Sequence, residues 1–133
     1  MEEFEIIFYE TPDGKCPVED FINGLSKKMR EKIFKSIDLL RIKGNSLREP
    51  YSKSLDDGIF ELRCKVGNDI TRTLYFFYIG KKIIMTNGFI KKTQRTPRSE
   101  LDLAKARRED YIKREEENKN ENLRRVQERA VEK

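Results

Sequence analysis

The stretch IFELRCKVGNDITRTLYFFYIGKKIIMTNGFI, residues 59–90, decides the fold of this chain. It contains three runs rich in aromatic and β-branched residues, which are typical of strands. These runs are 59–66, 70–79 and 82–90. Both connections between them begin with glycine and are short enough to be hairpin turns. The sequence therefore predicts an antiparallel meander of three strands.

Before this meander, the sequence predicts one strand and two helices. The segment EFEIIFY, residues 3–9, alternates loosely in polarity and is expected to be a strand. A proline at its first position suits a short helix over 17–25. From residue 27 to about 43, apolar residues recur at helical spacing, with Ser26 as the N-cap and Gly44 as the stop.

The resulting element order is β-α-α-β-β-β, with the polar stretch 45–58 as a loop between the helices and the meander. Runs of strands beside runs of helices, without strict alternation, are typical of an α+β fold. We expect the two helices to form a hairpin that covers one face of the sheet. The other face is then expected to be free.

The chain divides into a core, residues 1–97, and a C-terminal helical extension, residues 98–133. Of its 13 Phe and Tyr residues, 12 fall in the core. A Thr-Pro pair predicts the start of the last helix. The apolar residues of this helix are expected to dock it on the core up to about residue 112. The next ten residues, 113–122, contain no apolar side chain, so this part is expected to face solvent.

Composition excludes several classes of protein. No run of 18 or more apolar residues and no secretory leader is present, so we expect a cytoplasmic protein without a membrane span. Cys16 and Cys64 cannot build a disulfide framework and are expected to be small buried residues. Because the chain has no histidine, we expect no metal site of the usual zinc type and no imidazole base. We also expect no cofactor.

Charge is distributed unevenly along the chain. The net charge is +5, made up of −6 for residues 1–26, +10 for residues 27–97 and +1 for residues 98–133. So basic a middle segment is expected to attract a polyanion, with nucleic acid as the leading candidate.

The basic residues of the meander are expected to gather on one face of the sheet. Arg63 and Lys65 are two apart on one strand, and Arg72 lies across the hairpin from them. Other basic residues flank the meander: Lys53, Lys91, Lys92, Arg95 and Arg98. If the helix hairpin covers one face, these cations converge on the other, where they would repel one another unless an anion binds.

An ordered series of short motifs carries a family resemblance. The series runs KSLDDGIFELR, R-x-LYFF, NGF-x-KKTQ-x-TP and A-x-R, within residues 53–112. With this series and the same element order, the chain resembles the RelE/HigB superfamily of bacterial toxins over about residues 3–112, in particular its phage-derived Gp49-like branch. The resemblance implies a RelE-like core and a ribosome-dependent endonuclease that cuts messenger RNA. It also implies a cognate HigA-like helix-turn-helix antitoxin.

The resemblance also implies site residues. The basic active-site positions of the family match Arg63, Arg72, Lys91 and Lys92, which are expected to be catalytic. The residues expected to bind RNA are Lys53, Lys65, Asn87, Phe89, Arg95 and Arg98. The family often has His at the position of Asn87, so a scheme with an imidazole there cannot operate in this chain. Tyr75 is a second candidate, beside Phe89, for stacking on a base.

The chemistry of these residue types is compatible with the RNA cleavage that the resemblance implies. Cleavage of RNA without a metal needs an activated 2′-OH, stabilised charge on the phosphorane and a protonated 5′-oxygen. Arginines are suited to the phosphate oxygens, and a lysine crowded by cations has a lowered pKa and can exchange protons. Either Lys91 or Lys92 could do so.

Two other functions remain open at this point. A relative that poisons gyrase would share the fold and the antitoxin but would not cut RNA. A non-catalytic nucleic-acid-binding module would show salt-sensitive binding without strand scission.

Overall fold

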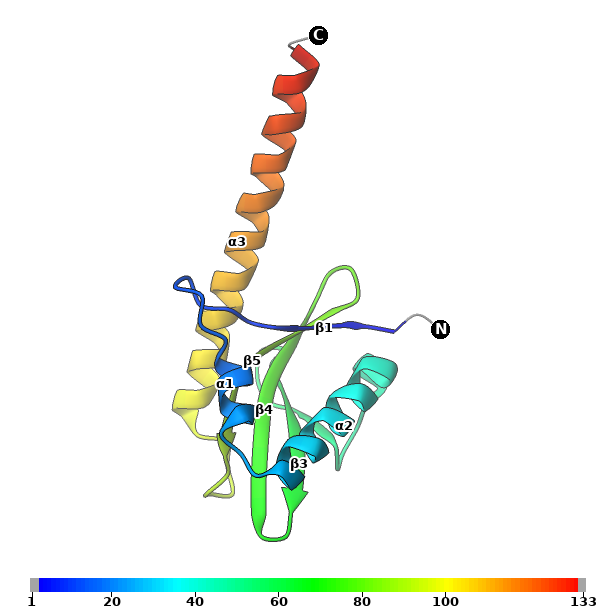
Figure 1. Ribbon diagram of the computed structural model, residues 1–133, viewed down its shortest axis with the longest axis vertical. Coiled ribbons are helices and arrows are strands. Elements are labelled where there is room, and N and C mark those ends of the chain that lie inside the picture. The colour runs from blue at the N-terminus through cyan, green and yellow to red at the C-terminus, as the bar shows by residue number, and fades with distance from the viewer. Residues whose placement is uncertain (1–2, 132–133) are drawn as a thin grey trace.

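A computed structural model of the chain describes residues 3–131, and its centre is a five-stranded sheet (Figure 1). The elements in chain order are β1 (Glu5–Phe8), α1 (Pro17–Asn23), α2 (Lys27–Lys43), a 3-10 turn η1 (Gly44–Ser46), β2 (Ser52–Ser54), β3 (Phe60–Val66), β4 (Asp69–Tyr78), β5 (Lys82–Ile90) and α3 (Arg98–Val131). The strand order is β1-β5-β4-β3-β2. Because β1 runs parallel to β5 and the other neighbours are antiparallel, the sheet is mixed. The predicted α+β class is confirmed.

The strongest local signals of the sequence predict their elements correctly. The meander of β3, β4 and β5 is antiparallel as expected. Helix α2 has the predicted bounds, and the Ser26 hydroxyl accepts a hydrogen bond from the Met29 N–H at its start. Gly44 ends the helix with a φ of 55°, a conformation that glycine adopts without a steric penalty.

The stretch 45–58, expected to be a loop, contains a strand. Residues Ser52–Ser54 form β2, which pairs with β3 at the edge of the sheet. The sequence Ser-Lys-Ser has no alternation of apolar and polar residues, so nothing local predicts a strand there. Tertiary contacts hold it instead, because the Ser52 hydroxyl is buried and hydrogen-bonded to the hydroxyl of Tyr75.

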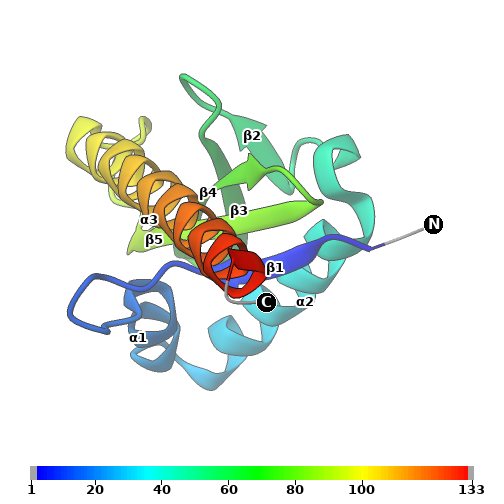
Figure 2. The same cartoon turned by 90° about the horizontal axis from the view of Figure 1, so that it is seen from above.

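Each face of the sheet carries its own hydrophobic core. On one face, α1 and α2 pack against the sheet, and α1 contributes Val18 and Ile22 to that core. On the other face, α3 lies across the sheet (Figure 2). Its Ala104 is buried in one core with Leu74 and Ile84. The expectation of a free second face is therefore wrong. The physical reason is that β4 and β5 are apolar on both faces, so each face needs a cover.

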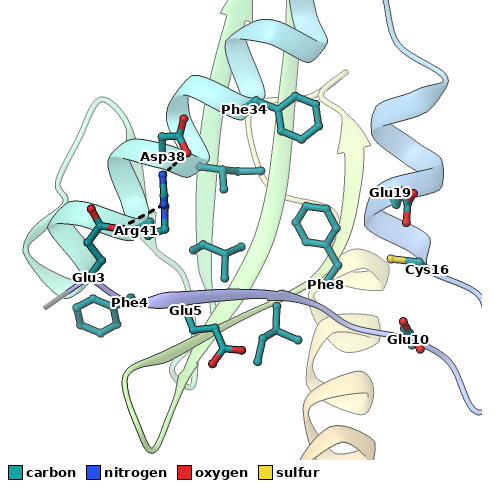
Figure 3. Close-up of a pocket in the computed structure, with 13 residues that line it drawn as sticks. Glu3, Phe4, Glu5, Phe8, Glu10, Cys16, Glu19, Phe34, Asp38 and Arg41 are labelled. Carbon is teal, nitrogen blue, oxygen red and sulfur yellow. Dashed lines mark hydrogen bonds and ion pairs between the residues drawn. The ribbon is translucent and has the colours of Figure 1, made fainter.

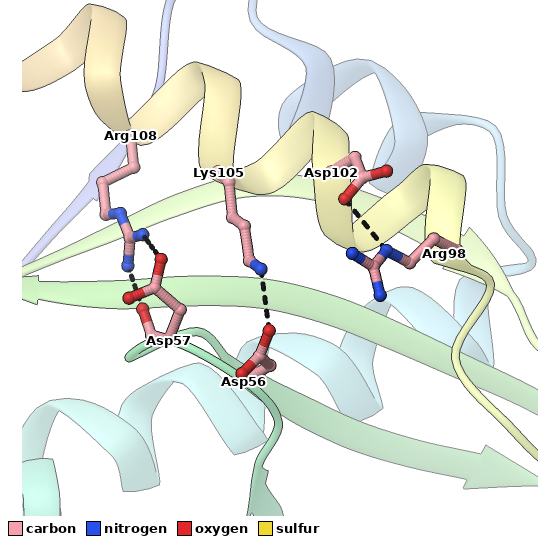
Figure 4. Close-up of polar contacts among 6 residues, drawn as sticks. All are labelled: Asp56, Asp57, Arg98, Asp102, Lys105 and Arg108. Carbon is pink, nitrogen blue, oxygen red and sulfur yellow. Dashed lines mark hydrogen bonds and ion pairs between the residues drawn. The ribbon is translucent and has the colours of Figure 1, made fainter.

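Ion pairs and a hydrogen bond connect α3 to the segments on either side of it. Lys105 pairs with Asp56 at 2.8 Å and Arg108 with Asp57 at 2.7 Å, both in the loop between β2 and β3 (Figure 4). Further along, Asp110 accepts a hydrogen bond from the Tyr9 hydroxyl at 2.6 Å. These contacts hold the first half of the helix against the body.

The second half of α3 leaves the body of the protein. Residues 116–130 are exposed throughout, and Figure 1 shows this part of the helix projecting past the sheet. Opposite charges one turn apart support it, as in the pair of Arg125 with Glu121 at 2.8 Å. Two apolar residues of this segment, Leu123 and Val126, face solvent.

Gly88 of β5 is predicted to be required for the close approach of α1. A Cβ atom at this position would overlap the ring of Phe21. We expect Gly88→Ala to lower the free energy of unfolding by about 1–3 kcal/mol, measured by urea denaturation, because Phe21 must shift. Adding Phe21→Leu should recover part of the loss. A Gly88→Ala protein as stable as the parent would contradict this account.

Candidate functional site

A buried carboxylate lies at the centre of the basic residues. Glu61 of β3 has a side chain only 3% exposed, and its Oε1 accepts a hydrogen bond from Arg63 Nε at 3.0 Å. The same oxygen forms an ion pair with Arg72 Nε at 3.3 Å. Its other oxygen, Oε2, accepts a hydrogen bond from the Thr96 hydroxyl at 2.6 Å. One carboxylate therefore holds two guanidinium groups and the loop before α3.

Strand register brings these side chains to one face. Arg63 lies directly opposite Arg72, and Arg72 lies opposite Phe89 on β5. Glu61 lies opposite Lys53 of β2. Residues directly opposite one another in a sheet project from the same face, so all of these belong to the face that α3 partly covers.

Lys91 joins the same group of charges. Its N–H donates to the Ile70 carbonyl at 2.8 Å, which continues the pairing of β4 and β5 beyond the end of β5. Desolvation lowers the pKa of Lys91, and the positive charges of Arg72 and Arg63 lower it further, with a smaller effect from Lys53 and an opposing one from Glu61. We call Glu61, Lys53, Arg63, Arg72 and Lys91 the Glu61 cluster.

The remaining predicted basic residues do not contact the Glu61 cluster within the part of the chain that the structure describes. Lys65 projects from the same face of β3, but it is exposed and pairs with Ile70 near the end of the strand. Lys92 and Arg95 are exposed on the segment after β5. Arg98 is exposed and pairs instead with Asp102 of α3 at 3.3 Å (Figure 4). Charge alone does not predict which cations converge.

Asn87 and Phe89 link the cluster to α3. The side-chain N–H of Asn87 donates to the Glu100 carbonyl at 3.2 Å, in the first turn of α3. Phe89 is half-buried and packs at the margin of the core under α3. Tyr75 is only 1% exposed and lies in the core under α1 and α2, so the expectation that it could stack on a base is wrong.

Sequence reasoning gave no role to Glu61 and Thr96. Glu61 stands in the quoted motif GIFELR, two positions before Arg63 and therefore on the same strand face. A carboxylate two positions from an arginine, and therefore on the same strand face, is the signal that could have predicted a buried ion pair. No local pattern connects Thr96 to it, because 35 residues separate them.

The cluster can bind an anion through its arginine side chains. Arg72 is 8% exposed and Arg63 is 24% exposed. Burial lowers the pKa of Arg72, but a guanidinium group stays protonated in proteins. Among the described residues, Arg63 makes its contact through Nε, which leaves its Nη atoms available. Four cations against one carboxylate give a formal charge of +3, which suits a phosphate.

Cys16 differs from the sequence-based expectation, whereas Cys64 agrees with it. Cys64 is buried and its thiol contacts the Ser36 hydroxyl at 3.3 Å. Cys16 is only half-buried at the start of α1. Burial raises the pKa of both thiols above the ordinary value, which disfavours a reactive thiolate.

Comparison with known protein families identifies the chain. Residues 20–109, which contain the whole Glu61 cluster, match the family described as phage derived protein Gp49-like (DUF891). The chain belongs to this family. Gp49-like proteins are a RelE/HigB-like toxin family associated with toxin–antitoxin systems, so membership implies an antitoxin partner. No curated protein matches the chain. Within residues 3–131, every helix is too short or too polar to cross a lipid bilayer.

Proposed function

We propose that this chain is a toxin that cuts messenger RNA at the ribosome without a metal ion and that a HigA-like helix-turn-helix antitoxin neutralises it. The observation that carries the proposal is the convergence of Lys53, Arg63, Arg72 and Lys91 around Glu61. These residues lie in the segment that matches the Gp49-like family.

Each group of the cluster has a distinct role in the proposed cleavage. Lys91, in its neutral form, takes the proton of the 2′-OH, and the resulting oxygen attacks the neighbouring phosphorus. Arg63 and Arg72 bind the phosphate oxygens and stabilise the charge that develops on them. The bond from phosphorus to the 5′-oxygen then breaks, and a proton from Lys53 completes the leaving group. The products are a 2′,3′-cyclic phosphate and a 5′-OH end.

The geometry favours Lys91 over Lys92 as the proton-transfer group. Desolvation is the largest cause of the lowered pKa of Lys91, and the neighbouring cations Arg72 and Arg63 lower this pKa further because they stabilise the neutral amine. Lys92 is exposed and lies after the residue whose N–H continues the pairing with β4. Proton transfer by a positioned side chain typically accelerates a reaction by about 10²–10⁴-fold.

Glu61 positions the arginines in this proposal and takes no part in the proton transfers. Arg63 and Arg72 are directly opposite in the sheet, where two like charges repel each other. The carboxylate between them offsets that repulsion and orients both guanidinium groups through their Nε atoms. Arg72 Nη1 donates to the Thr71 carbonyl at 3.2 Å, so among the described residues the Nη atoms of Arg63 and Nη2 of Arg72 are left to bind a phosphate.

Partial burial of the cluster supports a requirement for the ribosome. Arg72 is almost fully buried and α3 covers part of the face, so only part of the cluster is open to solvent. A flexible RNA must be ordered before one phosphate can enter, and ordering it costs entropy. The decoding site of the ribosome would supply a transcript that is already ordered.

The proposal predicts message fragments with 5′-OH ends when the protein is induced in cells. We expect them only on messages that are being translated, and mapping the fragment ends after blocking initiation checks this. A gyrase-inhibiting relative would leave messages intact and change DNA supercoiling. A non-catalytic binder would leave both unchanged. Intact messages in induced cells whose growth has stopped would overturn the proposed nuclease.

A further inference from the structure

Within residues 3–131, the edge strand β1 presents unpaired backbone groups on the far side from β5, beyond Phe4, whose N–H donates to the Arg41 carbonyl of α2 at 2.9 Å. Strand β1 stands at one end of the sheet order. The N–H of Glu5 donates to Lys81 and that of Tyr9 donates to Met85, so alternate residues of β1 face its neighbour β5. Alternation turns the N–H and C=O groups of Ile6 and Phe8 away from the sheet. Such an edge can accept another strand.

A groove of about 910 Å³ runs along this open edge, between β1 and the helices α1 and α2. Its apolar lining includes Phe8, Ile37 and Phe34, and Phe34 is 47% exposed. Figure 3 shows the rings of Phe34 and Phe8 beside the groove, with Glu10 and Glu19 near one end of β1. A large exposed aromatic ring beside unpaired backbone is typical of a binding surface.

Carboxylates dominate the polar lining of the groove. They are Glu3, Glu5, Glu10, Glu19 and Asp38. The cation of this lining, Arg41, already pairs with Glu3 at 3.3 Å and with Asp38 at 2.6 Å. On the α3 side of β1, a second hollow of about 400 Å³ adds Glu115 and Glu117, and the cation in its lining, Arg114, pairs with Asp110 at 2.7 Å. The open edge therefore lies between two acidic walls.

We propose that this groove binds a basic, extended segment of a partner protein, which adds to β1 as a sixth strand. Backbone groups of Ile6 and Phe8 would pair with the incoming strand, as in other cases of strand addition. Its Lys and Arg side chains would reach Glu10 and Glu19, and its apolar side chains would cover Phe34. Acidic walls disfavour a nucleic acid. They also disfavour a second copy of this chain, whose own β1 edge carries the same charges.

This surface is separate from the Glu61 cluster and does not rest on the proposed nuclease activity. Strand β1 and β2 stand at opposite ends of the sheet, and the cluster extends from β2 to the end of β5. A partner in the groove would thus bind without covering the cluster.

The test uses the full chain and a fluorescent peptide of about seven residues that alternates Lys with Val. We expect saturable binding that weakens as salt is raised, because charge pairs contribute to it. Amide hydrogen exchange of Ile6 and Phe8 should slow when the peptide is bound, while that of Ile7 stays unchanged. The same peptide with Glu in place of Lys, or with N-methyl groups along its pairing edge, should bind at least about tenfold more weakly.

Matched charge reversals inside and outside the groove distinguish an effect of the groove residues from an effect of the net charge of the chain. Glu10→Lys together with Glu19→Lys should weaken binding of the Lys-Val peptide by at least about tenfold. Glu31→Lys together with Glu128→Lys makes the same change in net charge at exposed positions outside the groove and should have little effect. Equal weakening by both pairs, or undiminished binding of the N-methyl peptide, would overturn the proposal. Self-association of the free chain through β1 would also overturn it.

Discussion

Lys91→Met is expected to lower ribosome-dependent cleavage of messages by at least about 100-fold, whereas Lys92→Met lowers it less than about threefold. The two variants each remove one lysine charge at adjacent positions. A difference between them therefore reports on the position of the lysine and not on the loss of charge. The N–H of Lys91 continues the pairing of β5 with β4, and desolvation and the charges of Arg72 and Arg63 lower the pKa of this lysine. The measurement is the yield of 5′-OH fragments from one induced message, compared at equal amounts of soluble protein. Equal losses for both variants would remove Lys91 from its proposed role.

The lowered pKa of Lys91 fixes the direction of the pH dependence. An amine acts as a base only when neutral, so the cleavage rate should rise as the pH passes through the pKa of Lys91, which lies below the ordinary lysine value of 10.5. In Arg63→Gln one of the cations that lower this pKa is lost, so the inflection should move to higher pH. Single-turnover cleavage on purified ribosomes measures both profiles. An inflection that stays in place would contradict this assignment.

Glu61→Ala is expected to lower the free energy of unfolding by about 3–5 kcal/mol, since removing one partner of a buried ion pair leaves uncompensated charge. Here Arg72 and the less buried Arg63 would lose their shared carboxylate. Urea denaturation measures the loss, and Glu121→Ala serves as the control because its pair with Arg125 is exposed.

A double-mutant cycle tests whether the loss comes from the ion pair itself. Glu61→Ala combined with Arg72→Met should cost less than the sum of the two single changes, since the second change removes the charge that the first leaves unpaired. Additive losses would show that Glu61 acts on stability through something other than Arg72. Glu61→Gln keeps hydrogen-bonding capacity without the charge, so we expect an intermediate loss.

Local and strongly periodic signals predicted most of the fold. Helix α2 has a capping serine, a continuous apolar stripe and a terminal glycine, so its bounds follow from the chain itself. The strands of the meander combine high β-propensity with short turns. Strand β2 could not be predicted, because its three residues are polar and gain their strand conformation only from pairing with β3. The position of α3 over the second face also depends on long-range packing.

The candidate site was predictable only in part for a similar reason. Alternation along β3 and the hairpin between β3 and β4 placed Arg63 and Arg72 on one face. The choice between Lys91 and Lys92 needed the register of β5 on β4, which a β-bulge between Leu74 and Tyr75 shifts by one residue. The contact of Glu61 with Thr96 could not be predicted from the sequence, because the two residues are far apart in the chain and only the folded structure brings them together.

The exposed end of α3 restricts the directions from which large molecules can approach. At 1.5 Å per residue, residues 116–131 extend roughly 24 Å. This rod departs near β1, whereas the start of α3 lies beside the Glu61 cluster, because Thr96, two residues before the helix, donates a hydrogen bond to Glu61. A bulky assembly can thus reach the cluster without colliding with the rod. A molecule bound at β1 lies next to the exposed end of α3. Steric exclusion by this helix would therefore limit the orientations in which such a molecule can bind.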